Sequence, residues 1–246
     1  QITIPLTSYN SDFGCDENYP VIGGVVTGVL SIRFSPRLCV IEDLIVPEGE
    51  TLTIGKGHTL IFLPGRRMII AGQLIAQNHT RFTGDAEAGW GGIHFLSSTQ
   101  LSECLQCSVS NIESGGVALR VDAPLIFKYG SIKNVPNGTA ISSTVPITLT
   151  NMVVDNVSVG LDLSTNENLL QRIPHLTMSR CQSCVVNRGQ KLALENSIFT
   201  YSENAILTEL SGTTTVSYSL FYSNTRDFLT EPGSQLIQGP GLLFED

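Results

Sequence analysis

The chain has 246 residues, of which 41% are hydrophobic and 15% charged, and its formal net charge is −8. This composition excludes an intrinsically disordered chain. With only 14 Lys and Arg residues, no basic stripe marks a nucleic-acid-binding protein or a protein of anionic membrane surfaces. No apolar run approaches the roughly 20 residues that cross a bilayer, so we expect no membrane span in this chain.

Residues 1–20 are predicted to form an irregular N-terminal arm that caps a single domain of residues 21–246. The arm holds Cys15, and the first part of the domain holds Cys39. We expect these two cysteines to form a disulfide that ties the arm to the domain.

Short apolar runs, each ended by a Gly or Pro turn, fill residues 42–77. The runs "LIV", "TLTI", "TLIFL", "MIIAG" and "QLIA" are too short for helices but long enough for strands. Gly and Pro mark the corners between them. The segment therefore predicts a chain that turns after nearly every strand.

A repeat of 22 residues follows in the middle of the chain. Residues 124–142 align with residues 146–164 at this offset, so that Phe127 falls on Leu149, Ile132 on Val154 and Ile141 on Leu163. Residues 194–202 match residues 216–224 at the same offset. A period of this size indicates stacked units whose strands pair with the equivalent strands one unit above and below.

We therefore predict an all-β fold, a right-handed parallel β-helix (a solenoid) of about nine or ten coils. Val, Ile, Leu and Phe at equal offsets would stack inside as the core. Asn111, Asn134 and Asn156 fall together at one corner, where Asn tolerates left-handed backbone and its amide bonds to the Asn above and below.

Three glycosylation triplets begin at Asn78, Asn137 and Asn156. Because a stacked Asn156 amide is not free, Asn78 and Asn137 are the predicted glycan sites. The triplets and the even number of cysteines, six, predict a secreted protein or the extracellular part of a cell-surface protein.

Several motifs resemble the right-handed parallel β-helix proteins of the pectate-lyase-like superfold. They are "VIEDLIVPEGETLTIGKGHTLIFLPGRRMIIAGQLIAQ" at 40–77, "GWGGIHF" at 89–95 and "VSYSLFYSNTRDF" near the end, and the resemblance runs from about Val21 onward. "GGVVTGVLSIRFSPRLCV" is more loosely similar to the extracellular β-helix segments of the animal cell-junction protein bark beetle, also called anakonda. The resemblance implies a fold shared by lyases, hydrolases, adhesins and scaffolds, so it does not decide function.

Candidate catalytic residues are few. A polysaccharide lyase needs calcium-binding acids beside a basic residue that removes a proton. Lys133 and Asp155, which stack one repeat apart, are weak candidates, because an exposed ion pair is the favoured explanation for them. Arg120 and Asp162 lie late in their strands and are candidates to face a cleft.

Asp85 and Glu87, in a loop before Trp90, are weak candidates for a calcium site. Neither a ladder of acids nor a pair of catalytic carboxylates is visible in the sequence.

Two Cys-X-X-Cys motifs remain, Cys104 with Cys107 and Cys181 with Cys184. They lie about three and a half coils apart, too far for one zinc site. Without a helix to lower a thiol pKa, a redox motif of the thioredoxin type is not indicated. We expect disulfides, with pairing inside each motif as the only suggestion.

Aromatic residues offer two further interpretations. Trp90, in "WGGI", is expected to pack at a corner. Tyr129, Tyr201, Tyr218 and Tyr222 are candidates to form the rim of a groove.

The sequence therefore predicts an extracellular β-helix module for binding or adhesion, without catalytic activity. The alternative is a carbohydrate-active enzyme, a polysaccharide lyase or glycoside hydrolase acting on an acidic polysaccharide. The expected partner is an extracellular protein or glycan rather than nucleic acid, and self-association is possible. No cofactor is expected, with calcium as the one candidate.

Overall fold

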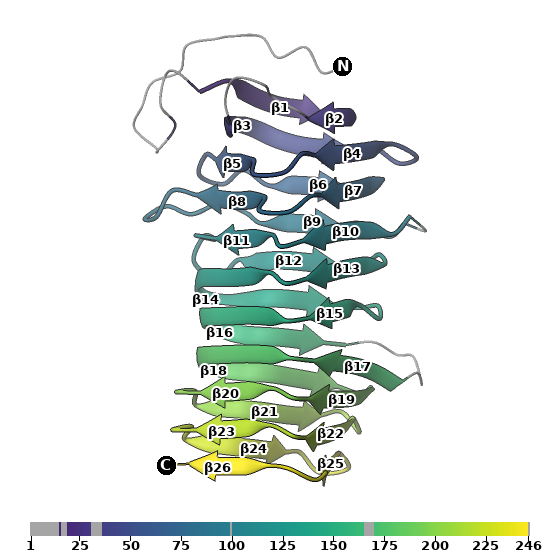
Figure 1. Ribbon diagram of the computed structural model, residues 1–246, viewed down its shortest axis with the longest axis vertical. Coiled ribbons are helices and arrows are strands. Elements are labelled where there is room, and N and C mark those ends of the chain that lie inside the picture. Colours follow the sequence, from purple (N-terminus) through teal and green to yellow (C-terminus); the bar gives the residue numbers. More distant parts are fainter. Residues whose placement is uncertain (1–14, 16–18, 31–35, 99, 165–169, 246) are drawn as a thin grey trace.

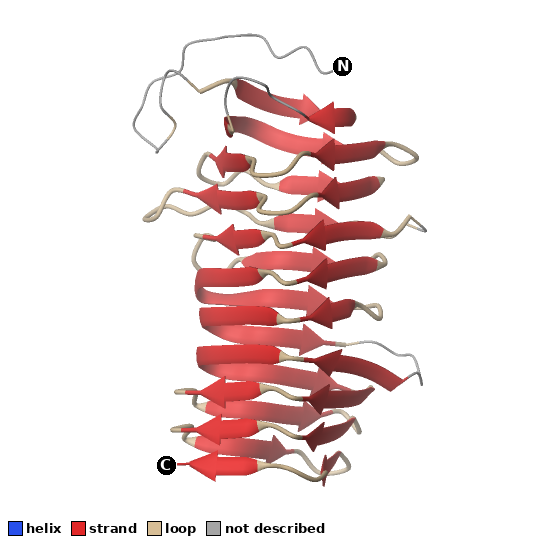
Figure 2. Cartoon of the chain, viewed as in Figure 1, coloured by secondary structure: helices blue, strands red, loops and turns tan. Residues whose placement is uncertain are grey.

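A computed structural model describes residues 15, 19–30, 36–98, 100–164 and 170–245. These residues form 26 strands and no helix, which confirms the all-β prediction. The strands stack into one column of about ten coils, with β1 and β26 at opposite ends (Figure 1). Figure 2 shows the same column coloured by strand and loop. The described residues contain no helix long and apolar enough to cross a membrane.

Each coil has three faces, which we call faces 1, 2 and 3 in the order in which the chain meets them. Four long strands run through faces 1 and 2: β3 (Arg37–Val46), β14 (Ser131–Ser143), β16 (Met152–Leu163) and β18 (Leu176–Arg188). β1 (Val21–Val25) pairs with β3.

Shorter strands complete the faces. Face 1 holds β5 (Thr59–Phe62), β8 (Arg81–Gly84), β11 (Ser108–Ser110), β20 (Ile198–Thr200), β23 (Leu220–Tyr222) and β26 (Leu243–Glu245). Face 2 holds β6 (Met68–Ile70), β9 (Ile93–Phe95), β12 (Val117–Val121), β21 (Asn204–Glu209) and β24 (Arg226–Thr230).

Face 3 is divided into two sheets. The first holds β2 (Gly28–Leu30), β4 (Thr51–Ile54), β7 (Gln73–Ala76), β10 (Ser102–Leu105), β13 (Leu125–Lys128) and β15 (Thr148–Thr150). The second holds β17 (Leu170–Pro174), β19 (Lys191–Glu195), β22 (Thr213–Ser217) and β25 (Gln235–Gln238).

The predicted register is largely confirmed. Phe127 lies opposite Leu149, and Ile132 lies opposite Val154. Neighbouring strands are parallel, as stacked coils require. Side chains therefore alternate between the core and the outside, and the ring centroids of stacked core residues lie close, 5.2 Å apart for Phe199 and Phe221.

The offset of 22 fails at one corner. As far as Val135, each paired residue of β14 lies opposite the residue 22 positions later in β16. Beyond the corner at 136–138 the offset is 20, so Ile141 lies opposite Leu161 and the predicted alignment of Ile141 with Leu163 is wrong. The corner of β14 is two residues longer than that of β16, and the extra residues bulge out of the ladder.

The predicted asparagine stack is present at the corner between faces 1 and 2. Asn134 donates its amide N–H to Asn111 at 3.2 Å, and Asn156 donates to Asn134 at 3.1 Å. All three have positive φ, between 57° and 58°. The stack satisfies the amides while turning the chain.

The N-terminal arm is described only at Cys15, Tyr19 and Pro20, so most of the predicted cap lies outside the described residues. The disulfide between Cys15 and Cys39 is confirmed, with their Cα atoms 5.7 Å apart. Both cysteines are buried in a small cluster with Val21 and Leu63.

Candidate functional site

Lys133 and Asp155 lie side by side on face 1, as their spacing predicts. The direct ionic partner of Asp155 is nevertheless Arg180, whose Nε donates to Oδ1 at 2.8 Å. Ser179 donates to the same oxygen at 2.6 Å. The hydrogen bonds from Arg180 hold the pKa of Asp155 below its usual value, against partial burial, and Lys133 adds only a longer-range attraction. The carboxylate is thus occupied by a structural pair.

This pairing predicts a loss of stability in acid. A carboxyl whose folded-state pKa is depressed stabilises the fold above its unfolded-state pKa, and this stabilisation is lost as the pH falls through the folded-state pKa. We expect urea unfolding to show a steeper loss of stability below about pH 5 for the natural protein than for Asp155→Asn. Lys133→Gln, the matched control, should keep most of the pH dependence. Equal slopes for the natural protein and Asp155→Asn would contradict the role of this pair.

Arg120 and Asp162 lie on face 2, two strands apart in the register Arg120, Ser142, Asp162. Asp162 accepts from Arg188 at 2.8 Å, and Arg188 also binds Glu209 at 2.6 Å. The four candidate catalytic residues are therefore divided between two faces and do not share one cleft.

A polar cluster that sequence reasoning missed lies beside Arg120. The Asp122 carboxylate accepts from Thr144 at 2.6 Å and lies 3.0 Å from Nε2 of His94. Partial burial alone would raise the pKa of Asp122, but Thr144 and His94 together hold it below its usual value. The offset from Asp122 to Thr144 was a visible signal, whereas His94 lies 28 residues away. In a catalytic triad the nucleophilic hydroxyl donates to a histidine. Here the Thr144 hydroxyl donates to the Asp122 carboxylate instead, so the cluster does not have the arrangement of a triad.

Asp85 stabilises its own turn. Its Oδ1 accepts the backbone N–H groups of Glu87 at 2.8 Å and Ala88 at 3.0 Å. These hydrogen bonds lower the pKa of Asp85. In the described part of the chain, no group of three His, Cys, Asp or Glu side chains is placed to hold a metal ion.

The four cysteines of the two Cys-X-X-Cys motifs are buried and free, so the disulfides expected for them are not formed here. Within each motif the thiols are neighbours. The pKa of Cys104 is raised mainly by its hydrogen bond with Cys107 and secondly by burial. The pKa of Cys181 is raised by the same two causes, with Cys184 as its hydrogen-bond partner. Cys104 lies in β10 and Cys107 just after it, whereas Cys181 and Cys184 both lie within β18, and all four side chains face the core.

We expect these thiols to resist alkylation in the folded protein, because a buried thiol with a raised pKa offers little thiolate. Mass spectrometry after iodoacetamide treatment should show no added groups in buffer and four in urea, where the protein is unfolded. Modification in buffer at the same rate as in urea would show that the motifs open readily.

The predicted glycan sites differ in surroundings. Asn137 is exposed, and its amide donates to Ser114 at 3.2 Å. Asn78 is exposed at a corner and lines a hollow on face 3. Asn156 is held by the asparagine stack, as expected.

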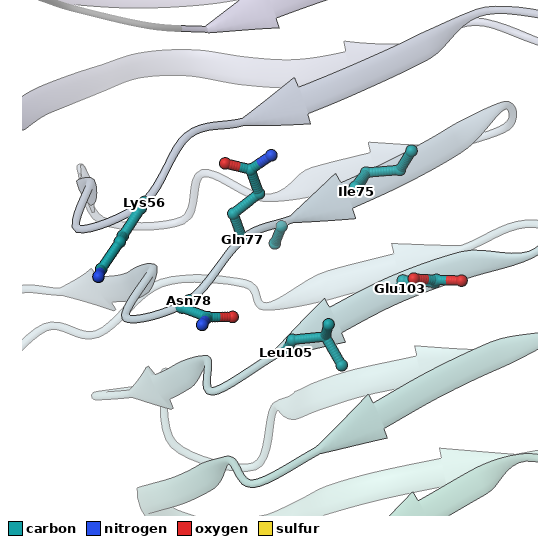
Figure 3. A pocket seen from close by; sticks show the side chains of 7 residues that line it. Lys56, Ile75, Gln77, Asn78, Glu103 and Leu105 are labelled. Carbon is teal, nitrogen blue, oxygen red and sulfur yellow. The ribbon is translucent and has the colours of Figure 1, made fainter.

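The hollow on face 3 has a volume of about 310 Å³. Figure 3 shows Lys56 and Glu103 at its opposite ends, with Gln77 and Asn78 between them. One carboxylate without a second one nearby does not provide the pair that glycoside hydrolysis uses.

Three tyrosines lie on or beside face 1 near its C-terminal end: Tyr222 in β23, Tyr201 at the corner that leads to face 2, and Tyr218 at the corner that leads in from face 3. We call Ile198, Tyr201, Tyr218, Leu220 and Tyr222 the tyrosine surface. Tyr201 and Tyr218 are each 59% exposed and Ile198 is 39% exposed. Ile198 lies opposite Leu220, and the rings of Tyr201 and Tyr222 meet edge to face, 5.4 Å apart. Neighbouring coils thus present apolar and aromatic side chains on face 1 and at the corners on either side of it.

Two of these tyrosines have strained backbones. Tyr201 and Tyr218 have φ of 52° and 49°, in the left-handed region that costs about 1–2 kcal/mol for a residue with a Cβ. The equivalent corner residues of neighbouring coils, Ser223 for Tyr201 and Asn196 for Tyr218, also have positive φ, so the corner geometry imposes this conformation. Tyr129 is predicted to belong with them, but it lies several coils away. It occupies the corner equivalent to that of Tyr218. Successive coils carry at this corner Tyr129, Asn151, His175, Asn196 and Tyr218.

The tryptophan is not part of a surface. Trp90 is fully buried and stacks on Phe62 with the ring centroids 4.0 Å apart. Its indole N–H donates to Ser110 at 2.9 Å. The expectation of a packing role near a corner is therefore met.

No family model matches the chain, and no curated protein is similar to it in sequence. The functional argument therefore depends on the fold and on the surfaces described above.

Proposed function

We propose that this chain is an extracellular binding or adhesion module without catalytic activity, and that its tyrosine surface contacts the partner. The observation that carries the proposal is the exposure of Ile198 on face 1 and of Tyr201 and Tyr218 at its two corners. Contiguous exposed apolar groups on a protein surface mark interaction sites, and tyrosine is enriched in such interfaces.

The solenoid supports this role by holding the surface rigid. Each tyrosine belongs to a strand or corner that is hydrogen-bonded to the coils on both sides, for example from the Tyr201 N–H to the Tyr222 carbonyl at 3.1 Å. A pre-organised surface loses little conformational entropy on binding.

The resemblance of the early coils to the pectate-lyase-like superfold, and of residues 23–40 to the junction protein, supports a place among secreted or cell-surface β-helix proteins. The disulfide of Cys15 with Cys39 supports an oxidising compartment.

The alternative is a polysaccharide lyase. It is disfavoured because Asp155 and Asp162 are each engaged by an arginine and lie on different faces. A lyase assay separates the two proposals: the protein is incubated with calcium and a panel of polyuronates while ultraviolet absorbance reports unsaturated product. Turnover that Lys133→Ala or Asp155→Ala abolishes would overturn the binding proposal.

Binding is tested on an array of extracellular matrix proteins and neutral and acidic glycans, with labelled protein as the probe. The test variant carries Tyr201→Asn, Tyr218→Asn and Tyr222→Thr, since Asn tolerates left-handed backbone and Thr occupies the position opposite Tyr222 on the preceding coil. We expect the array signal of the natural protein to be lost in this variant and kept in Leu210→Asn, which removes an apolar side chain that is 67% exposed from a left-handed position outside this surface. Sedimentation of both proteins shows whether the partner is a second copy. A signal that survives the triple variant would place the contact elsewhere and contradict the proposal.

A further inference from the structure

A second hollow lies on the N-terminal half of face 1, at the corner that leads in from face 3. Its volume is about 390 Å³. One side is formed by Arg81, Ser108, Ser131 and Val153, which follow one another in register on four neighbouring strands. The opposite side is formed by residues of the corner, among them Tyr129. The hollow therefore spans several coils and is built on regular backbone.

Arg81 supplies a positive charge with which no carboxylate in the described part of the chain forms an ion pair. Its side chain is exposed. The residues that line the hollow include no Asp or Glu. The lining of the hollow on face 3, in contrast, contains an acid, Glu103, as well as Lys56. In a chain with a net charge of −8, an open arginine in a hollow without acids is a specific site of positive potential.

Hydroxyl groups stand beside this charge. Ser108 lies directly opposite Arg81 on the next strand, and Ser131 lies opposite Ser108. Strands in a sheet are about 4.8 Å apart, so the guanidinium and the two hydroxyls form a row in which each can reach a shared ligand. In the described structure neither serine hydroxyl has a hydrogen-bond partner within the protein.

Tyr129 provides an aromatic wall. It is 59% exposed and has φ of 57°, so a bulky ring is kept at a left-handed corner although it packs little. The corner positions on either side carry planar amides, Gln106 and Asn151, which also line the hollow. A ring beside planar amides and hydroxyls presents both an apolar surface and hydrogen-bonding groups.

We propose that this hollow binds a single sugar ring that carries one anionic substituent, a sulfate ester or a carboxylate. Arg81 pairs with the anionic oxygens, for which its planar guanidinium is suited. Ser108 and Ser131 donate to the same group or to ring hydroxyls, and Tyr129 packs against the face of the ring.

The overall charge selects a ligand with one negative group rather than many. A chain of uronates would bring repeated negative charge against a protein of net charge −8, and this repulsion opposes binding. A terminal or isolated charged sugar on an otherwise neutral glycan meets only the local field of Arg81.

This site is separate from the tyrosine surface. On the outer side of face 1, Val153 lies opposite Thr177, and Thr177 lies opposite Ile198. The hollow and the tyrosine surface therefore belong to different coils, and either proposal can fail without the other.

Isothermal titration with glucose 6-sulfate, glucuronic acid, glucose and inorganic sulfate tests the proposal. We expect weak binding of one or both charged sugars and none of glucose. Arg81→Gln and Tyr129→Asn should each weaken binding about tenfold or more, which corresponds to about 1.4 kcal/mol. Arg120→Gln, which removes an exposed arginine on face 2, should bind like the natural protein.

Each other result overturns the proposal. Equal binding of glucose would show that Arg81 is not recognising a charge. Binding of inorganic sulfate as tight as that of glucose 6-sulfate would show that the ring is not recognised. Equal loss in Arg120→Gln would show non-specific charge attraction, and absence of binding by all three sugars would contradict the site itself. Circular dichroism of each variant confirms that the fold is unchanged.

Discussion

Gly92→Ala is expected to abolish folding to a soluble product, or to reduce the free energy of unfolding by about 4 kcal/mol or more. Gly92 precedes β9 and has φ of +79°. A Cβ there would lie 2.1 Å from the carbonyl oxygen of Val117 and 2.9 Å from that of Ala118. Both oxygens belong to β12, which pairs with β9. Relief of the clash therefore requires two paired coils to separate.

Gly115→Ala is the matched control for the steric argument. Gly115 has nearly the same φ, +77°, but no atom lies within 4 Å of the position that its Cβ would take. Only the cost of left-handed backbone applies, about 1–2 kcal/mol. Soluble yield and urea unfolding followed by circular dichroism measure both variants. Similar losses at the two positions would show that backbone strain, rather than the clash, determines the result.

Trp90→Ala is expected to reduce the free energy of unfolding by about 3–5 kcal/mol. The side chain is fully buried, so its loss leaves a cavity between Phe62 and the corner of the next coil. It also leaves the Ser110 carbonyl without the indole donor that now lies at 2.9 Å. Both terms act in the same direction.

Two further variants separate these terms. Trp90→Phe keeps a ring on Phe62 but removes the indole N–H, so we expect a smaller loss than for alanine. Tyr218→Asn removes an aromatic ring that is exposed, and it should leave stability nearly unchanged. The midpoint of urea unfolding gives the comparison; a Trp90→Ala midpoint close to that of the natural protein would mean that the core readily closes the cavity.

Much of the fold could be predicted because a solenoid repeats its chemistry at a fixed distance along the chain. Ile132 and Val154 occupy equivalent places in successive coils, and the same is true of Asn134 and Asn156. Register beyond a corner could not be predicted, because the length of a corner is not part of the repeat. Two additional residues at 136–138 were enough to move Ile141 to Leu161.

The polar contacts were less predictable than the core. Asp155 was expected to meet Lys133, one repeat away, yet its partner Arg180 is 25 residues later. Arg180 itself occupies a left-handed position, with φ of 53°, and its long side chain reaches back across a coil. The partner of such a long side chain depends on the backbone geometry at the corner. The spacing of the strands alone therefore does not predict which residue it contacts.

The stacking of the coils has a mechanical consequence. Since β1 and β26 lie at opposite ends of the column (Figure 1), a pull on the two ends acts along the hydrogen bonds that join successive coils. Those bonds would yield one coil at a time, and each released coil of 22 residues would extend by about 70 Å at most. Extension of the column under load is therefore expected to proceed in steps of one coil.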